Sequence, residues 1–382
     1  MSQGESRPLR VALVTSSYNF IADGVALTLN RLVGFLERQG VAVLVFAPTA
    51  DRPALVHQGQ LVSVPSIPLP GRPEYRLAPG LPGRLKQQLL DFRPDLIHIA
   101  VPDLLGHAAL SLAGRHNIPA VASYHTRYET YLKHYWYLTG LEGALKGILR
   151  RFYGRCREVY VPSESVREAL LADGLKDNFK PWPRGIDTER FSPAKRSAEW
   201  RTRHGIGPDE LVVLHVSRLV REKRLDTLTA ALNRLRVPHR VVIVGDGPDR
   251  GFAERELPHA LFTGFLGGEA LATAYASCDI FVFPSDSESF GNVTLEAMAS
   301  GLPCVAANAT GSRSLVVAGE TGFLAPADDA GAFAAHITTL AQDAGLRRRM
   351  GGAARARALT FSWEETMARL LGYYRALLRA PA

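Results

Sequence analysis

The residues best placed to do chemistry lie in the segment FPSDSESFGNVTLEAMASGLP, residues 283–303. An apolar run ends at Pro284, a polar loop follows, and residues 292–300 have helical character up to the stop signal Gly301. Free backbone N–H groups at the start of a helix hold anions, so this loop is a candidate phosphate site. The amides at this start belong to Phe290, Gly291, Asn292 and Val293.

Two carboxylates belong to this segment. Glu288 lies within the loop and Glu296 lies four residues into the helix, so both can line one pocket at different depths. The alternative is that Glu288 is a solvated loop residue and Glu296 a favourable charge near a helix N-terminus. Spacing alone leaves both interpretations open.

The second candidate is the segment HVSRLVREKRLDTLTAAL, which begins at His215. An apolar strand precedes Arg218, and helical periodicity starts at Leu225, just beyond Lys223. Cations at a helix start oppose the helix dipole, which suggests that an anion holds them. Two charge-assisted contacts of about 1.5–3 kcal/mol each, together with helix amides, would neutralise a departing diphosphate without a metal. The alternative is a solvated basic turn.

Three weaker signals lie at other strand ends. Gly24 follows the apolar run that starts at Val11, and Gly245 opens the turn GDGP; both are explained equally well as turn glycines. His125 follows an apolar run that ends at Tyr124, at a position where open parallel sheets bind ligands. A lone histidine is commonly structural, so the functional interpretation and the structural one both stand.

Short apolar runs separated by helical segments must position these residues. The runs are continuous rather than alternating, which is typical of strands buried on both faces in a parallel sheet. One series starts at residues 11, 41, 96, 120 and 159, and a second starts at 211, 241, 260, 280 and 304. We predict two doubly wound α/β units, joined by the irregular segment 182–200, whose strand-end loops face a shared cleft. The predicted boundaries are residues 1–190, 191–361 and a C-terminal helix, 362–382, that packs back on the first domain.

Length and composition limit the class of protein. The 382 residues are enough for two domains, and 46% hydrophobic and 21% charged residues are ordinary for a globular protein. We expect a cytoplasmic protein, because no eighteen-residue apolar run and no secretory signal pattern is present. Cys156, Cys278 and Cys304 are far apart without a CxxC pair, which predicts reduced structural thiols and no metal cluster.

Together, these stretches resemble the retaining glycosyltransferases of family 4, which have the GT-B fold of two Rossmann-like domains. The resemblance covers nearly the whole chain, in the family's order. It rests on Glu288 and Glu296 in ESFGNVTLEAMASGLP, on SRLVREK and VGDGP, on YHT at residues 124–126 and on RGID at residues 184–187. It implies that the first domain binds the acceptor and the second a nucleotide diphosphate sugar, linked to UDP or GDP, with no metal and no other cofactor.

The resemblance also implies roles for individual residues. Arg218 and Lys223 would grip the diphosphate, Glu288 the transferred sugar and Glu296 the ribose hydroxyls, and His125 would lie beside the anomeric carbon. Further donor contacts would come from Gly24, Gly245, Phe265 and Leu266, with the last two reading the base, and from the amides of Phe290, Gly291 and Asn292. The family usually has two glycines where this chain has Asp23 and Gly24. The resemblance therefore does not carry close backbone approach over to position 23, and Asp23 becomes a candidate partner for a hydroxyl of the acceptor or the sugar.

The net charge of +8, from 45 cationic and 37 acidic residues, is concentrated between Arg127 and Arg157, where seven cations accompany two acids. Aromatic residues alternate with these cations: Tyr128, Tyr131, Tyr135, Trp136, Tyr137 and Phe152. This mixture suits an anionic bilayer surface, so we expect peripheral docking on the inner face of the cytoplasmic membrane and a lipid acceptor such as diacylglycerol. The family branch that makes sulfoquinovosyl- and glucuronosyl-diacylglycerols and lipid-linked mannosides, which the motifs resemble most, implies the same acceptor class.

Three alternatives remain open at this point. The basic segment is also explained as a core helix with a solvated face, in which case the acceptor is a soluble molecule or a polysaccharide. A catalytically silent subunit that only binds nucleotide sugars would have the same pocket. A nucleic-acid partner is not expected, because no helix-turn-helix, RNP or zinc-finger pattern accompanies the basic charge.

Overall fold

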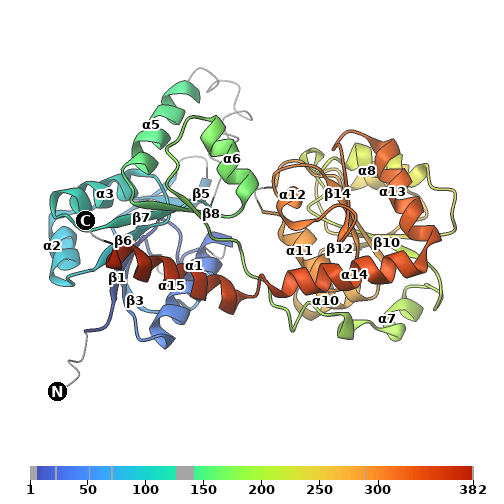
Figure 1. Cartoon of the computed structure of the whole chain (residues 1–382), viewed down its shortest axis with the longest axis horizontal. Helices are drawn as coiled ribbons and strands as arrows, with labels where there is room; N and C mark the ends of the chain where they lie inside the picture. The colour runs from blue at the N-terminus through green and yellow to red at the C-terminus, as the bar shows by residue number, and fades with distance from the viewer. Residues whose placement is uncertain are drawn as a thin grey trace. The chain divides into compact units, whose positions relative to one another are not determined.

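The computed structural model of the chain describes residues 7–21, 24–50, 52–69, 72–125, 142–288 and 290–380. Its contacts divide it into two compact units. Unit 1 comprises Met1–Trp182 and Met367–Ala382, and unit 2 comprises Pro183–Thr366. Each unit is built around a parallel sheet with helices packed against it (Figure 1). The prediction of two doubly wound α/β units is confirmed.

Unit 1 has, within the described residues, a seven-stranded sheet in the order β3-β2-β1-β6-β7-β8-β9, and all neighbouring strands are parallel. The strands are β1 (Arg10–Val14), β2 (Ala42–Ala47), β3 (Gln60–Ser63), β6 (Leu96–Ile99), β7 (Ala120–Ser123), β8 (Glu158–Val161) and β9 (Phe179–Pro181). The inner strands β6 and β7 are buried at every residue, as continuous apolar runs predict. An antiparallel pair, β4 (Ile67–Leu69) and β5 (Arg72–Leu77), lies outside this sheet.

The strands of unit 1 are connected by α1 (Gly24–Arg38), α2 (Gly83–Asp91), α3 (Leu104–Arg115), α5 (Glu142–Gly154) and α6 (Glu164–Ala172), and α15 (Trp363–Arg379) comes last in the order of elements. The side chains of Asp103 and Ser163 cap the N-termini of α3 and α6 by accepting backbone N–H bonds. Helix α15 starts in unit 2 and continues into unit 1 from Met367 onward.

Unit 2 has, in its described part, a six-stranded parallel sheet in the order β12-β11-β10-β13-β14-β15. The strands are β10 (Val212–Val216), β11 (Arg240–Val244), β12 (Leu261–Gly264), β13 (Ile280–Phe283), β14 (Cys304–Ala307) and β15 (Gly322–Ala325). The helices are α7 (Ala198–Arg203), α8 (Leu225–Asn233), α9 (Arg250–Glu256), α10 (Gly268–Ala276), α11 (Asn292–Ala299), α12 (Ser312–Leu315), α13 (Ala330–Gln342) and α14 (Ala344–Leu359). Because β10 and β13 are neighbours, the loops that follow them start at the same edge of the sheet.

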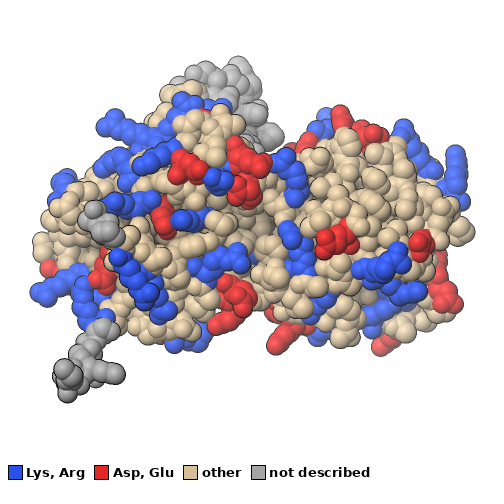
Figure 2. Space-filling model, viewed as in Figure 1, with Lys and Arg blue, Asp and Glu red and all other residues tan. Residues whose placement is uncertain are grey.

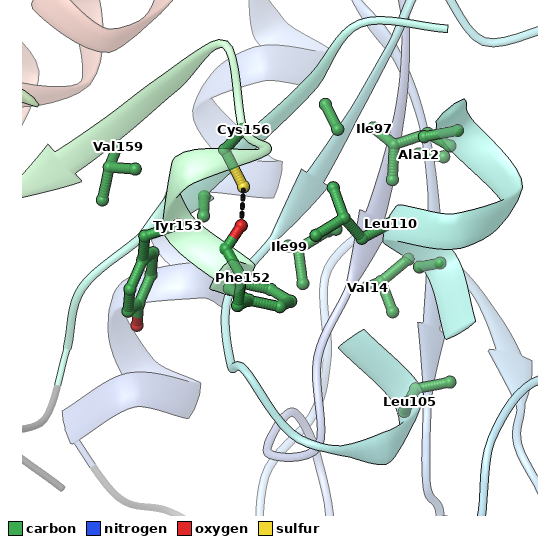
Figure 3. Packing of buried hydrophobic residues seen from close by; sticks show 14 of the residues in the cluster. Ala12, Val14, Ile97, Ile99, Leu105, Leu110, Phe152, Tyr153, Cys156 and Val159 are labelled. Carbon is green, nitrogen blue, oxygen red and sulfur yellow. Dashed lines mark hydrogen bonds between the residues drawn. The ribbon is translucent and has the colours of Figure 1, made fainter. Parts of the chain in front are cut away.

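The three cysteines are free and buried. Cys156 belongs to the core of unit 1, where its thiol lies 3.6 Å from the Phe152 carbonyl oxygen. Figure 3 draws this contact among the buried side chains. Burial raises the pKa of the Cys156 thiol to about 12, so the group stays protonated and packs as a small apolar side chain. The prediction of structural thiols therefore agrees with their positions.

Candidate functional site

The loop after β10 presents cations at the carboxyl edge of the unit 2 sheet. Arg218 is exposed just past the strand, and its side chain makes no hydrogen bond or ion pair within the described residues. A short 3-10 turn, η3 (Arg221–Lys223), follows. Arg224 then adopts a left-handed backbone, with φ 55° and ψ 47°, immediately before α8. This reversal ends η3 and starts α8 in a new direction.

The turn GDGP after β11 supports the β10 loop through backbone contact. A Cβ on Gly245, which has φ +130°, would lie 1.8 Å from the Ser217 carbonyl oxygen, and one on Gly247 would lie 2.3 Å from that of Leu219. The Leu219 amide also donates to the Asp246 carbonyl at 2.9 Å. Only glycine fits at both positions, so the structure gives Gly245 a packing role that places the β10 loop.

The loop after β13 leads into α11 as predicted. Gly291 is the N-cap residue of α11, with φ 91° and ψ 54°, and within the described residues no side chain accepts a hydrogen bond from the first amides of the helix. The Phe290 side chain is buried and packs on Phe361, at 6.1 Å between ring centroids, whereas Asn292 is exposed. A helix start that lacks a side-chain cap leaves backbone donors available to an anion.

Two ion pairs join the β10 loop to the β13 loop. The Lys223 ammonium pairs with Glu288, and both side chains are mostly buried, at 18% and 24% exposure. Next to it, Arg224 Nε donates to Asp286 Oδ2 at 3.0 Å. The structure thus brings together two residues that the sequence placed in separate motifs. Arg224 and Asp286 were not among the predicted site residues, because nothing in the spacing of SDSES indicates which carboxylate faces which cation.

Glu296 lies in α11 beside a buried tyrosine. The Tyr275 hydroxyl is 3.0 Å from Glu296 Oε2 and 3.2 Å from the Val293 carbonyl oxygen. Burial raises the pKa of the Glu296 carboxyl to about 7, and the Tyr275 hydrogen bond opposes that rise. Tyr275 was missed by sequence reasoning, since a tyrosine in an apolar helix predicts only core packing.

Phe265 and Leu266 follow β12 at the same edge of the sheet. The Phe265 side chain is 81% exposed, which is unusual for a phenylalanine, whereas Leu266 is partly buried against the core of unit 2. Gly264 has φ 72°, and its carbonyl accepts the Gly245 amide at 2.8 Å. This bond aligns the β12 loop with the GDGP turn.

Gly24 and His125 are predicted site residues of unit 1, whereas the other predicted site residues belong to unit 2. Gly24 opens α1 and is exposed, and its carbonyl accepts the Thr28 hydroxyl at 2.7 Å. His125 follows β7, and its Nε2 lies 2.8 Å from the Ser123 hydroxyl. Asp23 lies outside the described residues.

The basic segment is described only in part, because residues 126–141, with their tyrosines and Trp136, lie outside the described ranges. In α5 and just after it, Arg150, Arg151, Arg155 and Arg157 are exposed, and Figure 2 shows Lys and Arg side chains gathered over this helix. Ile148 is 50% exposed on the same helix. Phe152 does not belong to that surface: it is 1% exposed, and its ring lies 4.9 Å from that of His107. The helical period turns Phe152 toward the core.

No helix in the described part of the chain is long and apolar enough to cross a bilayer. In the same ranges, no group of three or more His, Cys, Asp or Glu side chains is arranged to hold a metal ion.

Comparison with known sequences gives two family matches. Residues 196–357 match the family described as glycosyl transferases group 1, and residues 22–190 match glycosyltransferase family 4. The chain is 36% identical over 377 residues to a GDP-mannose-dependent alpha-mannosyltransferase of Mycobacterium tuberculosis, covering 97% of each chain. It is 33% identical over 368 residues to the sulfoquinovosyl transferase SQD2 of Arabidopsis thaliana, covering 94% of this chain and 72% of the relative. An alpha-monoglucosyldiacylglycerol synthase of Streptococcus pneumoniae is 29% identical over 314 residues, covering 78% of this chain and 71% of the relative.

Solved structures share the fold. A sucrose-phosphate synthase from Thermosynechococcus elongatus superposes with a TM-score of 0.76 at 23% identity, covering 98% of this chain and 100% of the other. Anabaena Alr3699/HepE, solved in complex with UDP, superposes with a TM-score of 0.72 at 19% identity, covering 96% and 100%.

Proposed function

The chain belongs to glycosyltransferase family 4, so it is a retaining glycosyltransferase of GT-B fold with a nucleotide-sugar donor, and we propose that it moves a hexose from a UDP- or GDP-linked donor to a membrane lipid such as diacylglycerol. The observation that carries the proposal is the meeting of the two motif loops of unit 2. Lys223 from the β10 loop contacts Glu288 from the loop that leads into the uncapped start of α11. A cation and free helix amides then lie at one edge of one sheet, which is the arrangement that a diphosphate needs.

Each part of the donor has a proposed partner in unit 2. Arg218 and Lys223 hold the diphosphate together with the amides of Phe290, Gly291 and Asn292. Glu288 binds the transferred sugar and Glu296 the ribose hydroxyls. Backbone around Phe265 and Leu266 reads the base, and Gly245 holds the β10 loop close to the donor. From unit 1, His125 lies beside the anomeric carbon and Gly24 approaches the donor. No metal is needed, because cations and amides already supply the positive charge.

The proposed chemistry is dissociation of the donor at its anomeric carbon. The bond from that carbon to the diphosphate oxygen breaks, and both electrons stay on the oxygen. The acceptor hydroxyl oxygen bonds to the carbon on the face that the diphosphate leaves, and the hydroxyl proton passes to the departing diphosphate, so the anomeric configuration is retained. Negative charge grows on the diphosphate as its bond to the carbon breaks. Arg218, Lys223 and the α11 amides interact more strongly with this charge in the transition state than in the ground state, which is the condition for rate acceleration. Losing one such donor costs about 3 kcal/mol, or roughly a hundredfold in rate.

The ion pair between Lys223 and Glu288 prepares this site before the donor binds. Each group partly neutralises the other, so the two loops keep their mostly buried charges at a lower desolvation cost than separate charges would have. Donor binding then gives Lys223 a phosphate oxygen and Glu288 a sugar hydroxyl in exchange. Lys223 then keeps an anionic partner, and Glu288 keeps a hydrogen-bond donor.

A lipid acceptor is supported by two observations. The names of the relatives include a diacylglycerol glycosyltransferase, the monoglucosyldiacylglycerol synthase of Streptococcus pneumoniae. In this chain, α5 presents exposed arginines next to the exposed Ile148, a mixture that suits the headgroup region of an anionic bilayer. We therefore place the protein in the cytoplasm, peripherally on the inner face of the membrane.

A transfer assay tests the proposal. The purified chain is incubated with UDP- and GDP-hexoses and with vesicles that contain diacylglycerol, and products are identified by mass spectrometry and anomeric NMR. The proposal expects a glycolipid with the anomeric configuration of the donor, and an Arg218→Ala variant that forms it at least about a hundredfold more slowly. Transfer only to soluble sugars would contradict the lipid acceptor, and donor binding without transfer or hydrolysis would contradict the catalytic role.

A further inference from the structure

A continuous chain of four side chains runs from His125 into the interior of unit 1. His125 Nε2 lies 2.8 Å from the Ser123 hydroxyl oxygen, and that oxygen lies 3.0 Å from His98 Nε2. His98 Nδ1 lies 2.5 Å from the hydroxyl oxygen of Tyr374. These hydrogen bonds therefore join β7, β6 and α15. Ser123, His98 and Tyr374 have no role in the proposed glycosyl transfer itself.

The inner three members are closed to water. Ser123 is 1% exposed, and His98 and Tyr374 are fully buried. Burial lowers the pKa of the His98 imidazole to about 3, so that ring is neutral at physiological pH and carries one N–H. Which group donates in each of these hydrogen bonds then follows from which polar atoms have a partner.

Tyr374 sets that direction. Within the described residues its hydroxyl has no partner other than His98, so an O–H that did not donate to His98 would be buried without an acceptor, at a cost of about 1–3 kcal/mol. Tyr374 therefore donates to His98 Nδ1, which makes His98 the Nε2–H tautomer. His98 Nε2–H donates to the Ser123 oxygen, and the Ser123 hydroxyl donates to His125 Nε2. In this arrangement the protons of Tyr374 Oη, His98 Nε2 and the Ser123 hydroxyl each have an acceptor.

We propose that Tyr374, His98 and Ser123 are positioning residues that fix His125 as the Nδ1–H tautomer and hold its ring in one orientation. A second contact restrains the same ring: Trp182 meets it edge-on, with centroids 5.7 Å apart and planes at 65°. Trp182 also meets His98 edge-on, at 6.1 Å and 64°. One tryptophan thus braces both histidines, and the hydrogen bonds select which nitrogen carries the proton.

This inference deepens the proposed function, because it rests on His125 lying beside the anomeric carbon of the donor. An imidazole there interacts differently with the sugar through N–H and through a lone pair, so an unspecified tautomer would leave part of the population in the wrong form. The tautomer of His125 is fixed from the C-terminal helix α15, which carries Tyr374. Tyr374 therefore contributes to the reaction although it lies outside both ranges that match the family, residues 22–190 and 196–357.

Helix α15 allows a matched pair of variants at neighbouring tyrosines. Tyr374→Phe removes the hydroxyl that donates to His98 and starts the series of hydrogen bonds that ends at His125. Tyr373→Phe removes a hydroxyl that donates to the Pro181 carbonyl at 3.1 Å, and it leaves the hydrogen bonds between Tyr374 and His125 intact. Both variants keep an aromatic ring at their position, and thermal melting of each shows how much of any effect is loss of stability.

Nitrogen-15 NMR of the histidines, without donor, reads the tautomers directly, and steady-state kinetics reads their consequence. We expect His125 as Nδ1–H and His98 as Nε2–H in the wild type and in Tyr373→Phe, and a mixture of tautomers in Tyr374→Phe. We also expect kcat to fall about tenfold or more in Tyr374→Phe, with the KM for donor unchanged. An Nε2–H tautomer of His125 in the wild type, or identical spectra and kcat in the two variants, would overturn the proposal. The NMR result stands without turnover, so a chain that transfers no sugar would refute the proposed function while leaving the tautomer assignment tested.

Discussion

Lys223 and Glu288 form an ion pair between two loops that are 65 residues apart in sequence and that start from neighbouring strands of the unit 2 sheet. The pair joins a cation that is proposed to hold the diphosphate to a carboxylate that is proposed to hold the sugar. Both side chains are mostly buried, so water screens the interaction less than it would on the surface. The pair is therefore a sensitive place to test the account.

Lys223→Ala is expected to lower kcat/KM for sugar transfer by about a hundredfold or more, because one charge is lost from the departing diphosphate. The matched control is Arg221→Ala, which removes an exposed cation from the same 3-10 turn. The control should change the rate less than about threefold. Equal loss in both variants would mean that general basicity of the turn, and not Lys223, assists the reaction.

Glu296 gives a pH dependence of stability with a definite sign. Its folded pKa of about 7 lies above the ordinary value of 4.5, so between these values the folded chain binds a proton that the unfolded chain has released. The contribution of Glu296 to the free energy of unfolding is fully present below pH 4.5 and is lost as pH rises through 7, a loss of roughly 3 kcal/mol.

The variant Glu296→Gln cannot ionise and should escape this loss. We expect it to be more stable than the wild type at pH 8, by up to about 3 kcal/mol, and equally stable at pH 4.5 in denaturant unfolding. Its donor affinity should nevertheless fall, since the ribose contact loses its charge. A stability difference that stays constant from pH 4.5 to pH 8 would show that the buried carboxyl does not titrate in this range.

Gly245→Ala should destabilise unit 2 and weaken donor binding together. The added Cβ meets the Ser217 carbonyl oxygen, so the loop that carries Arg218 must move, at an expected cost of at least about 2 kcal/mol. Gly268→Ala is the control: Gly268 also has a positive φ, of +56°, but a Cβ there has no neighbour within 4 Å. It should cost about 1 kcal/mol and leave donor affinity unchanged. Thermal melting and donor titration measure both quantities.

Membrane binding should depend on the arginines in α5 and just after it. Each cation near an anionic surface contributes about 1 kcal/mol, so the double variant Arg151→Gln, Arg155→Gln is expected to lose about 2 kcal/mol, or roughly thirtyfold, in vesicle partitioning. The control variant Arg348→Gln, Arg349→Gln removes the same charge from exposed positions of α14. Co-sedimentation with anionic vesicles measures the partitioning. Equal losses in both variants would show that net charge, not the α5 surface, controls it.

The inner strands of both sheets could be predicted from sequence because burial on both faces leaves an uninterrupted apolar run, as in β10 and β13. Edge strand β12 could be predicted too, from the apolar run that starts at residue 260, whereas the other three edge strands could not. In β3 the sequence QLVS is exposed at both ends, and β9 is the tripeptide FKP with two exposed residues. Strand β15 also escaped, since its GFLA is short and begins with Gly322, whose Cβ would lie 2.0 Å from the Cys304 carbonyl oxygen.

The residues of the candidate site also fall into those that the sequence predicts and those that it does not. Lys223, Glu288 and Glu296 belong to local motifs, in which strand end, loop and helix start are adjacent in sequence. The partners that orient such residues lie far away along the chain. Tyr374 is 276 residues from His98, and Tyr275 is 21 residues from Glu296. Spacing carries no information about contacts at that separation, so these residues emerge only when the fold brings the helices and strands together.

The measurement that tests the central claim most directly is a crystal structure of the chain with a bound UDP- or GDP-hexose, chosen by thermal-shift screening. The account predicts a pyrophosphate in contact with Arg218, Lys223 and the first amides of α11, with Lys223 no longer paired to Glu288 alone. A pyrophosphate bound elsewhere, with the Lys223–Glu288 pair intact and the α11 amides unoccupied, would contradict it.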